Sequence, residues 1–293
     1  MTSSATLFAL QFDTQFRLAT SGLPVLEIPL FRALQCTLIG LSSSFRVEEY
    51  HGGGHQVGFL GNGTFARRNA QCELSDLAII VYSRVSRTAR LTYLQAKAER
   101  AGLGSACGHK FSANLEQWYL LAKRPQLRGV RRFNPPADLL SGALLESVGT
   151  FGFFYRDVAG DFQIYYATAA YLSPPGTYSQ RYGKLQAKGP CTVLNTQGFR
   201  ECLAACGNQS FAASLYSLEI GTPVDRMNGR ASVRNWLAGN LRVQIREAPG
   251  RSAAAEELLD ILGAQRTDES ASGSVGAKSL IIIETDMASE RQG

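Results

Sequence analysis

Three residues in the first third of the chain carry side chains that suit a hydrolytic metal site. Asp76 precedes the apolar run Leu77–Tyr82, and Gln95 and Lys97 close a second run, Arg90–Lys97. Carboxylate and amide oxygens are ligands that Mg²⁺ accepts. The ion can activate water, and a lysine beside it can stabilise developing negative charge. Together these side chains suit hydrolysis of a phosphodiester.

A short antiparallel hairpin is expected to bring these residues together. Leu77–Tyr82 is rich in β-branched residues, as a buried strand would be, and Ser83–Thr88 is polar and turn-like. If Asp76 pairs with Gln95, the midpoint of the hairpin falls inside this turn. Paired side chains then have Cβ atoms ~5 Å apart. Gln95 and Lys97 share one face of their strand because side chains alternate.

The order Ser75-Asp76, strand, turn, strand, Gln95-x-Lys97 resembles the motif of PD-(D/E)XK nucleases in its Gln-x-Lys variant. The resemblance covers roughly residues 46–125. It implies a restriction-endonuclease-like fold, Mg²⁺ or Mn²⁺ as cofactor, Asp76 and Gln95 as metal ligands, and Lys97 as a catalytic residue. Ser75 replaces the proline of the motif. Gln95 replaces the usual acidic residue, which lowers the negative charge of the site.

In this family an upstream helix often contributes a glutamate. Glu48 or Glu49 is the expected residue, with Glu49 named as a metal ligand, because both stand just before the glycine-rich residues 51–63. Glu73 is a further choice. The alternative is an ordinary hairpin with a capping aspartate, a surface glutamine and an extended lysine whose stem lies along apolar surface.

Basic residues follow the motif, and the chain carries a formal net charge of +6. A basic surface with interleaved aromatic residues can track a phosphate backbone, so DNA is the expected partner and RNA a further one. The alternative is a solvated face. The candidate nucleic-acid contacts are Arg84, Arg87, Lys110, Lys123, Arg124, Arg128, Arg131 and Arg132.

The six cysteines are irregularly spaced, which is not typical of a secreted disulfide scaffold. We interpret Cys202 and Cys206 as buried thiols on a helix rather than as half of a zinc site with Cys107 and His109. Residues 1–20 mix polar side chains and do not resemble a signal peptide. No apolar run approaches the ~20 residues of a membrane span. The expected compartment is the cytoplasm.

The pattern of runs predicts an α/β protein with a mixed central sheet flanked by helices. We expect helices over Val25–Gly40, Asn114–Lys123, Leu139–Val148, Phe199–Ile220 and Ala253–Gly263, and a hairpin within Gly152–Tyr171. The expected organisation is a nuclease core over residues 1–145, an α/β extension or accessory domain over 146–264, a flexible linker over 265–279, and a terminal strand and tail over 280–293.

The leading functional expectation is a metal-dependent endonuclease that hydrolyses DNA, with host defence as the role that family analogy suggests. Enzymes of this type often act as homodimers. The main alternative is a catalytically inactive nuclease-like module that binds nucleic acid or a partner. A third interpretation is a scaffold whose Leu280–Glu284 segment docks on a partner strand.

Overall fold

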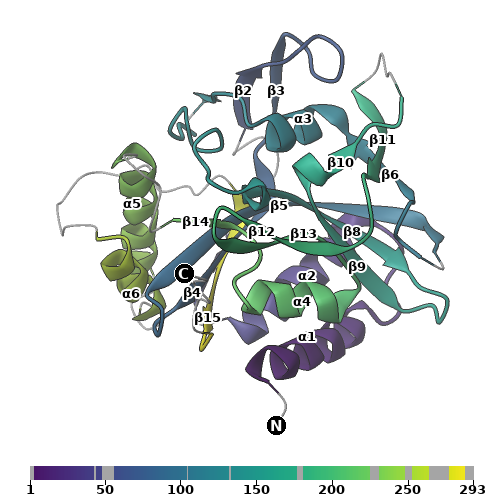
Figure 1. Ribbon diagram of the computed structural model, residues 1–293, viewed down its shortest axis with the longest axis horizontal. Coiled ribbons are helices and arrows are strands. Elements are labelled where there is room, and N and C mark those ends of the chain that lie inside the picture. The colour runs from purple at the N-terminus through teal and green to yellow at the C-terminus, as the bar shows by residue number, and fades with distance from the viewer. Residues whose placement is uncertain are drawn as a thin grey trace.

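A mixed β-sheet runs through the centre of the computed structural model (Figure 1). The structure describes residues 3–42, 44–47, 56–103, 105–131, 133–176, 181–224, 231–247, 253–263 and 277–287. The sheet has the strand order β1 (Ser44–Val47), β15 (Ala277–Thr285), β4 (Ser75–Ser83), β5 (Thr88–Gly102), β8 (Gly149–Arg156), β9 (Phe162–Thr168), β13 (Phe199–Cys206) and β12 (Thr192–Thr196), and β14 (Thr222–Pro223) pairs with β5. The pairs β15–β4 and β5–β8 are parallel and the others antiparallel, so the predicted mixed α/β fold is confirmed.

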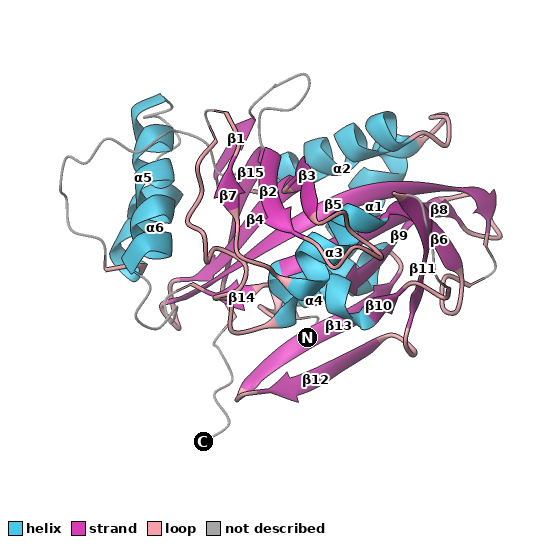
Figure 2. Cartoon of the chain, turned by 90° about the horizontal axis from the view of Figure 1, so that it is seen from above, coloured by secondary structure: helices cyan, strands magenta, loops and turns pink. Residues whose placement is uncertain are grey.

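Two small sheets and six helices surround the central sheet in the described part of the chain (Figure 2). One small sheet has the order β10 (Leu172–Ser173), β11 (Tyr182–Ala187) and β6 (Lys110–Asn114); the other has β3 (Asn69–Glu73), β2 (Gln56–Leu60) and β7 (Arg128–Gly129). The helices are α1 (Ser4–Thr20), α2 (Glu27–Leu41), α3 (Leu115–Lys123), α4 (Asn208–Tyr216), α5 (Ala231–Glu247) and α6 (Ala253–Ile261), with 3-10 turns η1 (Glu146–Val148) and η2 (Ala169–Tyr171).

Strand β4 is buried on both faces because helices cover both sides of the sheet. The odd-numbered residues from Leu77 to Val81 pack into a core with α1, α2 and α4. The even-numbered residues from Ala78 to Tyr82 pack into a second core with α3, α5 and α6. Figure 1 shows α1, α2 and α4 below the sheet and α3 with both small sheets above it. The continuous apolar run of β4 follows from this double coverage.

Several predicted elements are confirmed within a few residues. Helices α2, α3 and α6 match the predicted helices that begin near residues 25, 114 and 253. The hairpin of β8 and β9 turns within Asp157–Asp161, close to the predicted Gly160. Asn114 caps α3, since its side-chain oxygen accepts from the backbone N–H of Glu116 at 3.0 Å.

The predicted helix Phe199–Ile220 is wrong over its first half. Residues up to Cys206 form β13, which lies between β12 and β9 in the sheet. Helix α4 begins only after Gly207, whose φ of +91° is accessible to glycine and turns the chain off the strand. The apolar spacing of this stretch fits a helix as well as a strand, and pairing with two neighbouring strands decided the outcome.

The predicted helix Leu139–Val148 is also wrong, because the segment forms turns that end in η1. Side chains from other segments form hydrogen bonds with its backbone N–H and C=O groups. The Thr222 hydroxyl accepts from the N–H of Leu144 at 3.0 Å, and Arg124 donates to the carbonyl of Ala143 at 3.1 Å. These contacts replace the internal hydrogen bonds that a helix would need.

Strands on both sides of residue 145 belong to the same sheet, since β8 lies beside β5 and the chain then continues through β9 and β13. The predicted terminal strand is β15. It begins at Ala277, within the range expected for the linker, and lies parallel to β4. Residues 264–276 of the expected linker lie outside the described residues.

Candidate functional site

The β4–β5 hairpin has the register that the sequence predicts. Leu77 lies opposite Leu94, and every further pair keeps the same sum of residue numbers, so Asp76 stands opposite Gln95 at the mouth of the hairpin. The four turn residues, 84–87, include the predicted midpoint. Because β5 continues past its partner to Gly102, Lys97 extends beyond the paired region.

Asp76 and Gln95 are in direct contact and almost completely buried. The Gln95 side-chain amide donates to Oδ2 of Asp76, and the backbone N–H of Ala96 donates to the same oxygen at 3.0 Å. Gln117, on α3, donates to Oε1 of Gln95 at 3.0 Å. The carboxylate is thus fixed by its own hairpin and, through two amides, by the helix that covers this face of the sheet.

Lys97 lies at the wall of an open cavity, where it pairs with a glutamate of α2. Its Nζ is 3.1 Å and 3.2 Å from the two carboxylate oxygens of Glu27, the first residue of α2. The cavity has a volume of about 610 Å³. Its lining residues are Glu27, Lys97, Ala98, Ser112, Ala113, Asn114, Gln117, Tyr182, Gly183 and Lys184. Strands β6 and β11 therefore form the wall that faces the end of the hairpin.

A magnesium ion, which the resemblance implies, would need oxygen ligands at this end of the hairpin. Mg²⁺ usually keeps several waters and takes one or two carboxylates. Asp76 offers a buried carboxylate, and the carboxylate of Glu27 pairs with Lys97 at the cavity wall.

The other predicted acidic residues are Glu48, Glu49 and Glu73. Glu48 and Glu49 lie outside the described residues. Glu73 ends β3 and is paired opposite Gln56 in a small sheet. Glu27 is not among the predicted residues, although it stands in the first turn of the helix predicted from Val25, upstream of the hairpin where the resemblance implies a glutamate.

Arg84 and Arg87, at the tip of the hairpin, are paired with acidic residues of the same chain. Arg84 Nε is 2.5 Å from Glu257 and 2.8 Å from Glu284, and Arg87 is 2.7 Å from Asp260. These contacts join the turn to α6 and β15. Contact with a phosphate would have to compete with them.

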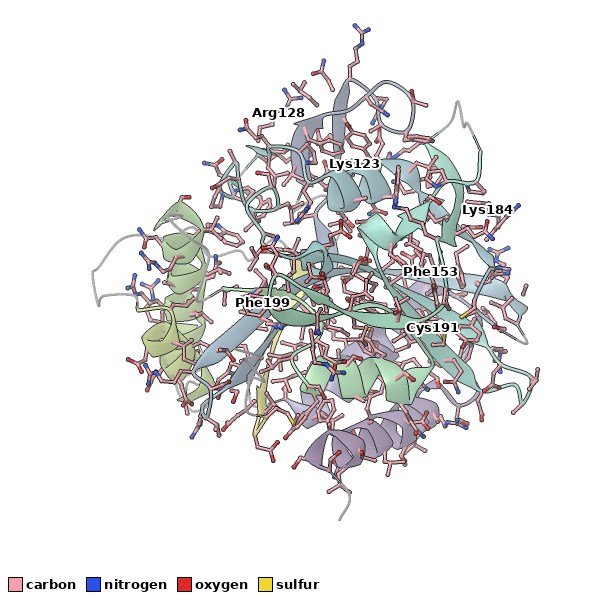
Figure 3. All side chains as sticks on the ribbon, viewed as in Figure 1. Lys123, Arg128, Phe153, Lys184, Cys191 and Phe199 are labelled. Carbon is pink, nitrogen blue, oxygen red and sulfur yellow. A yellow bond between two sulfur atoms is a disulfide. The ribbon has the colours of Figure 1, made fainter. Side chains whose placement is uncertain are left out.

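The other predicted basic contacts are spread over separate parts of the molecule. Lys110, Lys123, Arg128 and Arg131 are exposed, and Figure 3 places Lys123 and Arg128 at the top, near α3 and β7. Arg124 is turned inward, to the carbonyls of Ala143 and Leu145. Arg132 lies outside the described residues. At the cavity itself the lining cations are Lys97 and Lys184, and Lys184 is not among the predicted contacts.

A buried carboxylate flanks the first turn of α3. Glu116 is 2.6 Å from Nε of Arg67 and 3.4 Å from Nε of Arg181. Burial works to raise the pKa of Glu116, but the hydrogen bonds and charge of Arg67 and the charge of Arg181 outweigh it and hold that pKa below its ordinary value. The pair thus ties the loop before β3 to the helix that supports Gln95.

Cys107, Cys191 and Cys206 lie close enough together to share a metal ion. Within the described ranges, no other three histidine, cysteine or acidic side chains do so. The predicted location of Cys202 and Cys206 on a helix is wrong, since both lie in β13. Cys202 is a buried free thiol, as expected, and Cys206 is bonded to Cys191.

No family model, curated protein or solved structure matches this chain. Across the part of the chain that the structure describes, no helix has the length and apolar character of a membrane span.

Proposed function

We propose that this protein is a metal-dependent nuclease that hydrolyses DNA phosphodiester bonds at the end of the β4–β5 hairpin. The observation that carries the proposal is the convergence of Asp76, Gln95 and Lys97 at one end of this hairpin. Asp76 and Gln95 are in contact, and Lys97 stands two residues further along the same strand at a cavity. This is the arrangement that the Gln-x-Lys variant of the PD-(D/E)XK motif implies.

Each residue has a distinct part in this proposal. Asp76 and Gln95 hold the cation, and Glu27 takes the place of the upstream-helix glutamate. When bound, a divalent ion supplies positive charge for the transition state and acidifies a water molecule. Lys97 presents an ammonium group at the cavity, held there by Glu27, where it can orient the nucleophile and stabilise negative charge on the phosphoryl oxygens.

The cavity suits a nucleotide-sized part of a polyanion. Its volume of about 610 Å³ is in the range of small-ligand sites. Lys97 and Lys184 supply positive charge on its walls, and Tyr182 is exposed beside them, where it can stack on a base. The substrate phosphate would lie between the end of β5 and strand β11.

The alternative is a nuclease-like module that binds nucleic acid without cutting it. A specific observation favours it: the polar groups of the site are satisfied by one another. Oδ2 of Asp76 accepts from both Gln95 and Ala96, and the oxygen of Gln95 accepts from Gln117. A module that does not bind metal would keep this network intact.

The test is cleavage of supercoiled and linear DNA, and of RNA, with Mg²⁺ or Mn²⁺. We expect metal-dependent cutting by the wild type and a loss of about 100-fold or more in Asp76→Ala and Lys97→Ala. Lys188→Ala is the matched control, because Leu185–Lys188 repeats the sequence of Leu94–Lys97 and its lysine follows directly after β11. DNA binding without cutting, unaffected by metal, would support the alternative instead.

A further inference from the structure

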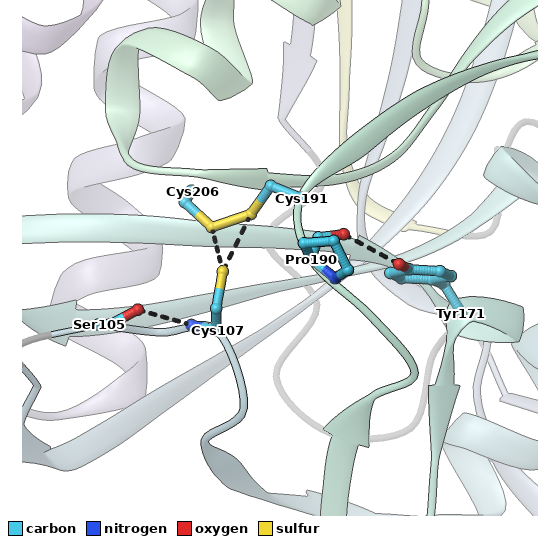
Figure 4. Close-up of a disulfide and its surroundings, with 6 residues drawn as sticks. All are labelled: Ser105, Cys107, Tyr171, Pro190, Cys191 and Cys206. Atoms are coloured by element: carbon cyan, nitrogen blue, oxygen red, sulfur yellow. Dashed lines mark hydrogen bonds between the residues drawn. A yellow bond between two sulfur atoms is a disulfide. The ribbon is translucent and has the colours of Figure 1, made fainter.

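Three cysteines from distant parts of the sequence lie close together in the structure. Cys107 precedes β6, Cys191 precedes β12, and Cys206 ends β13. Cys191 and Cys206 are joined by a disulfide (Figure 4). The sulfur of Cys107 is 3.0 Å from that of Cys206 and 3.5 Å from that of Cys191. The sequence separations are 99 and 84 residues, so the tertiary fold alone brings Cys107 to the pair.

The position of Cys107 does not suit thiol–disulfide exchange. In that reaction the attacking thiolate approaches one sulfur along the line of the bond that breaks. Its distances to the two sulfurs then differ by about one S–S bond length, roughly 2 Å. The two distances here differ by 0.5 Å, the difference between 3.5 Å and 3.0 Å. Cys107 therefore lies beside the bond, and the three sulfurs form a compact triangle.

A triangle of three sulfurs suits ligation of a soft metal ion. Zinc binds cysteine thiolates at about 2.3 Å in a tetrahedral arrangement, which places pairs of sulfurs about 3.8 Å apart. All three sulfurs lie within 4.8 Å of one another. Opening the Cys191–Cys206 bond would therefore require only small movements to surround an ion. The exposure of Cys107 leaves room for water as the fourth ligand.

We infer that the reduced chain binds one zinc ion through Cys107, Cys191 and Cys206. A dithiol reductant supplies two electrons and two protons to the Cys191–Cys206 bond and itself becomes a disulfide. Three thiols result, and the incoming ion displaces their three protons to solvent. The oxidised chain holds the disulfide and the free Cys107, so zinc and the disulfide are alternative occupants of the same three sulfurs.

The loops that carry the sulfurs are held by contacts that do not involve sulfur. The backbone N–H of Cys107 donates to the Ser105 hydroxyl at 3.2 Å, and the Tyr171 hydroxyl donates to the carbonyl of Pro190 at 2.9 Å (Figure 4). Gln186, on β11, donates to the carbonyl of Gly108 at 2.8 Å. The ligands are thus positioned before any ion arrives, which lowers the entropic cost of binding it.

The site would also fasten a wall of the cavity. The loop of Cys107 leads directly into β6, and β6 and β11 supply cavity residues including Ser112 and Lys184. Cys206 belongs to the central sheet. An ion bound between them would hold the small sheet against the central one, independently of what the cavity binds.

The test is metal content of the full chain after reduction with a phosphine under anaerobic conditions, loading with Zn²⁺ and removal of excess ion. We expect about one zinc per chain in the wild type, and the same in Cys36→Ser, which replaces an exposed cysteine on α2. Cys107→Ser and Cys191→Ser should lose it. Asp76→Ala should keep it, which separates this site from the one at the hairpin.

Cobalt substitution gives a readout that does not depend on variants. Co²⁺ bound by three thiolates in a tetrahedral site gives thiolate-to-metal charge-transfer bands and intense visible bands, and these should vanish when an oxidant restores the disulfide. A reduced wild type without stoichiometric zinc and without these bands would overturn the inference. So would zinc retention by a folded Cys107→Ser chain, with folding checked by circular dichroism.

Discussion

The contact between Asp76 and Gln95 predicts the behaviour of the Gln95→Glu variant. This substitution restores the acidic residue usual in the motif and sets a second carboxyl against a buried carboxylate. Burial and a neighbouring like charge both oppose ionisation of the introduced group, and together they raise the pKa of a carboxyl by about 3 units or more. At about 1.4 kcal/mol per unit, the variant should lose roughly 4 kcal/mol of stability near neutral pH.

The sign of the pH dependence follows from the raised pKa of the introduced carboxyl. Below the pKa of the unfolded chain, about 4.3, the group is neutral in both states and the variant should be nearly as stable as the wild type. As the pH rises from there towards the higher pKa of the folded state, stability falls relative to the wild type. A divalent ion between the carboxyls offsets part of this loss, because at about 100 times its Kd it adds about 2.7 kcal/mol of stability.

Urea unfolding from about pH 4 to pH 8, with and without Mg²⁺ or Mn²⁺, measures both effects. Gln186→Glu is the matched control, because Gln186 holds the same place in the second Leu-Gln-Ala-Lys sequence and is partly exposed. If the free energy of unfolding of Gln95→Glu equals that of the wild type at every pH, the contact between residues 76 and 95 is refuted. If stability falls strongly with pH and the metal does not restore it, the contact is supported but a cation does not bind between these two side chains.

Three further substitutions test the supporting structure. Arg67→Ala leaves Glu116 buried with only Arg181 nearby, so it should cost about 2 kcal/mol at neutral pH, and the cost in urea unfolding should shrink in acid as the carboxyl is protonated. Phe153→Ala removes a fully buried ring 4.3 Å from that of Phe111, and denaturant unfolding should show a loss of about 3–5 kcal/mol. Lys184→Ala should weaken DNA binding several-fold, as measured by fluorescence anisotropy. It should also reduce by about 1 the slope of the logarithm of the binding constant against the logarithm of the salt concentration. Lys188→Ala should have neither effect.

Each of these three predictions has a result that would contradict it. An Arg67→Ala penalty that stays constant into acid would mean that Glu116 does not carry the interaction. A loss under about 1 kcal/mol in Phe153→Ala would show that the aromatic stack is not packed as described. Equal DNA affinity in Lys184→Ala and wild type would place the nucleic acid away from the cavity.

The local parts of the site could be predicted from the sequence because they depend on neighbours in the chain. Leu77–Tyr82 is apolar at every position, the next residues favour a turn, and a hairpin fixes its own register once the turn is placed. The contact of Asp76 with Gln95 follows from that register alone. The helix that begins at residue 115 was equally predictable, from Asn114 at its cap and its apolar spacing.

The residues that complete the site could not be predicted in this way. Glu27 reaches Lys97 across 70 residues, and Lys184 enters the cavity because β11 pairs with β6. Each depends on how separate elements pack. A sequence pattern shows that such elements exist but not which of their side chains face one another.

The sequence by itself therefore determined the hairpin, its register and the class of fold, since period and turn chemistry are local properties. The tertiary structure alone decided that Phe199–Cys206 is a strand, that β15 lies parallel to β4, and that Cys107 joins Cys191 and Cys206. The physical reason is that apolar segments such as β13 are compatible with more than one backbone conformation. Burial and hydrogen bonding against partners distant in the sequence select among them.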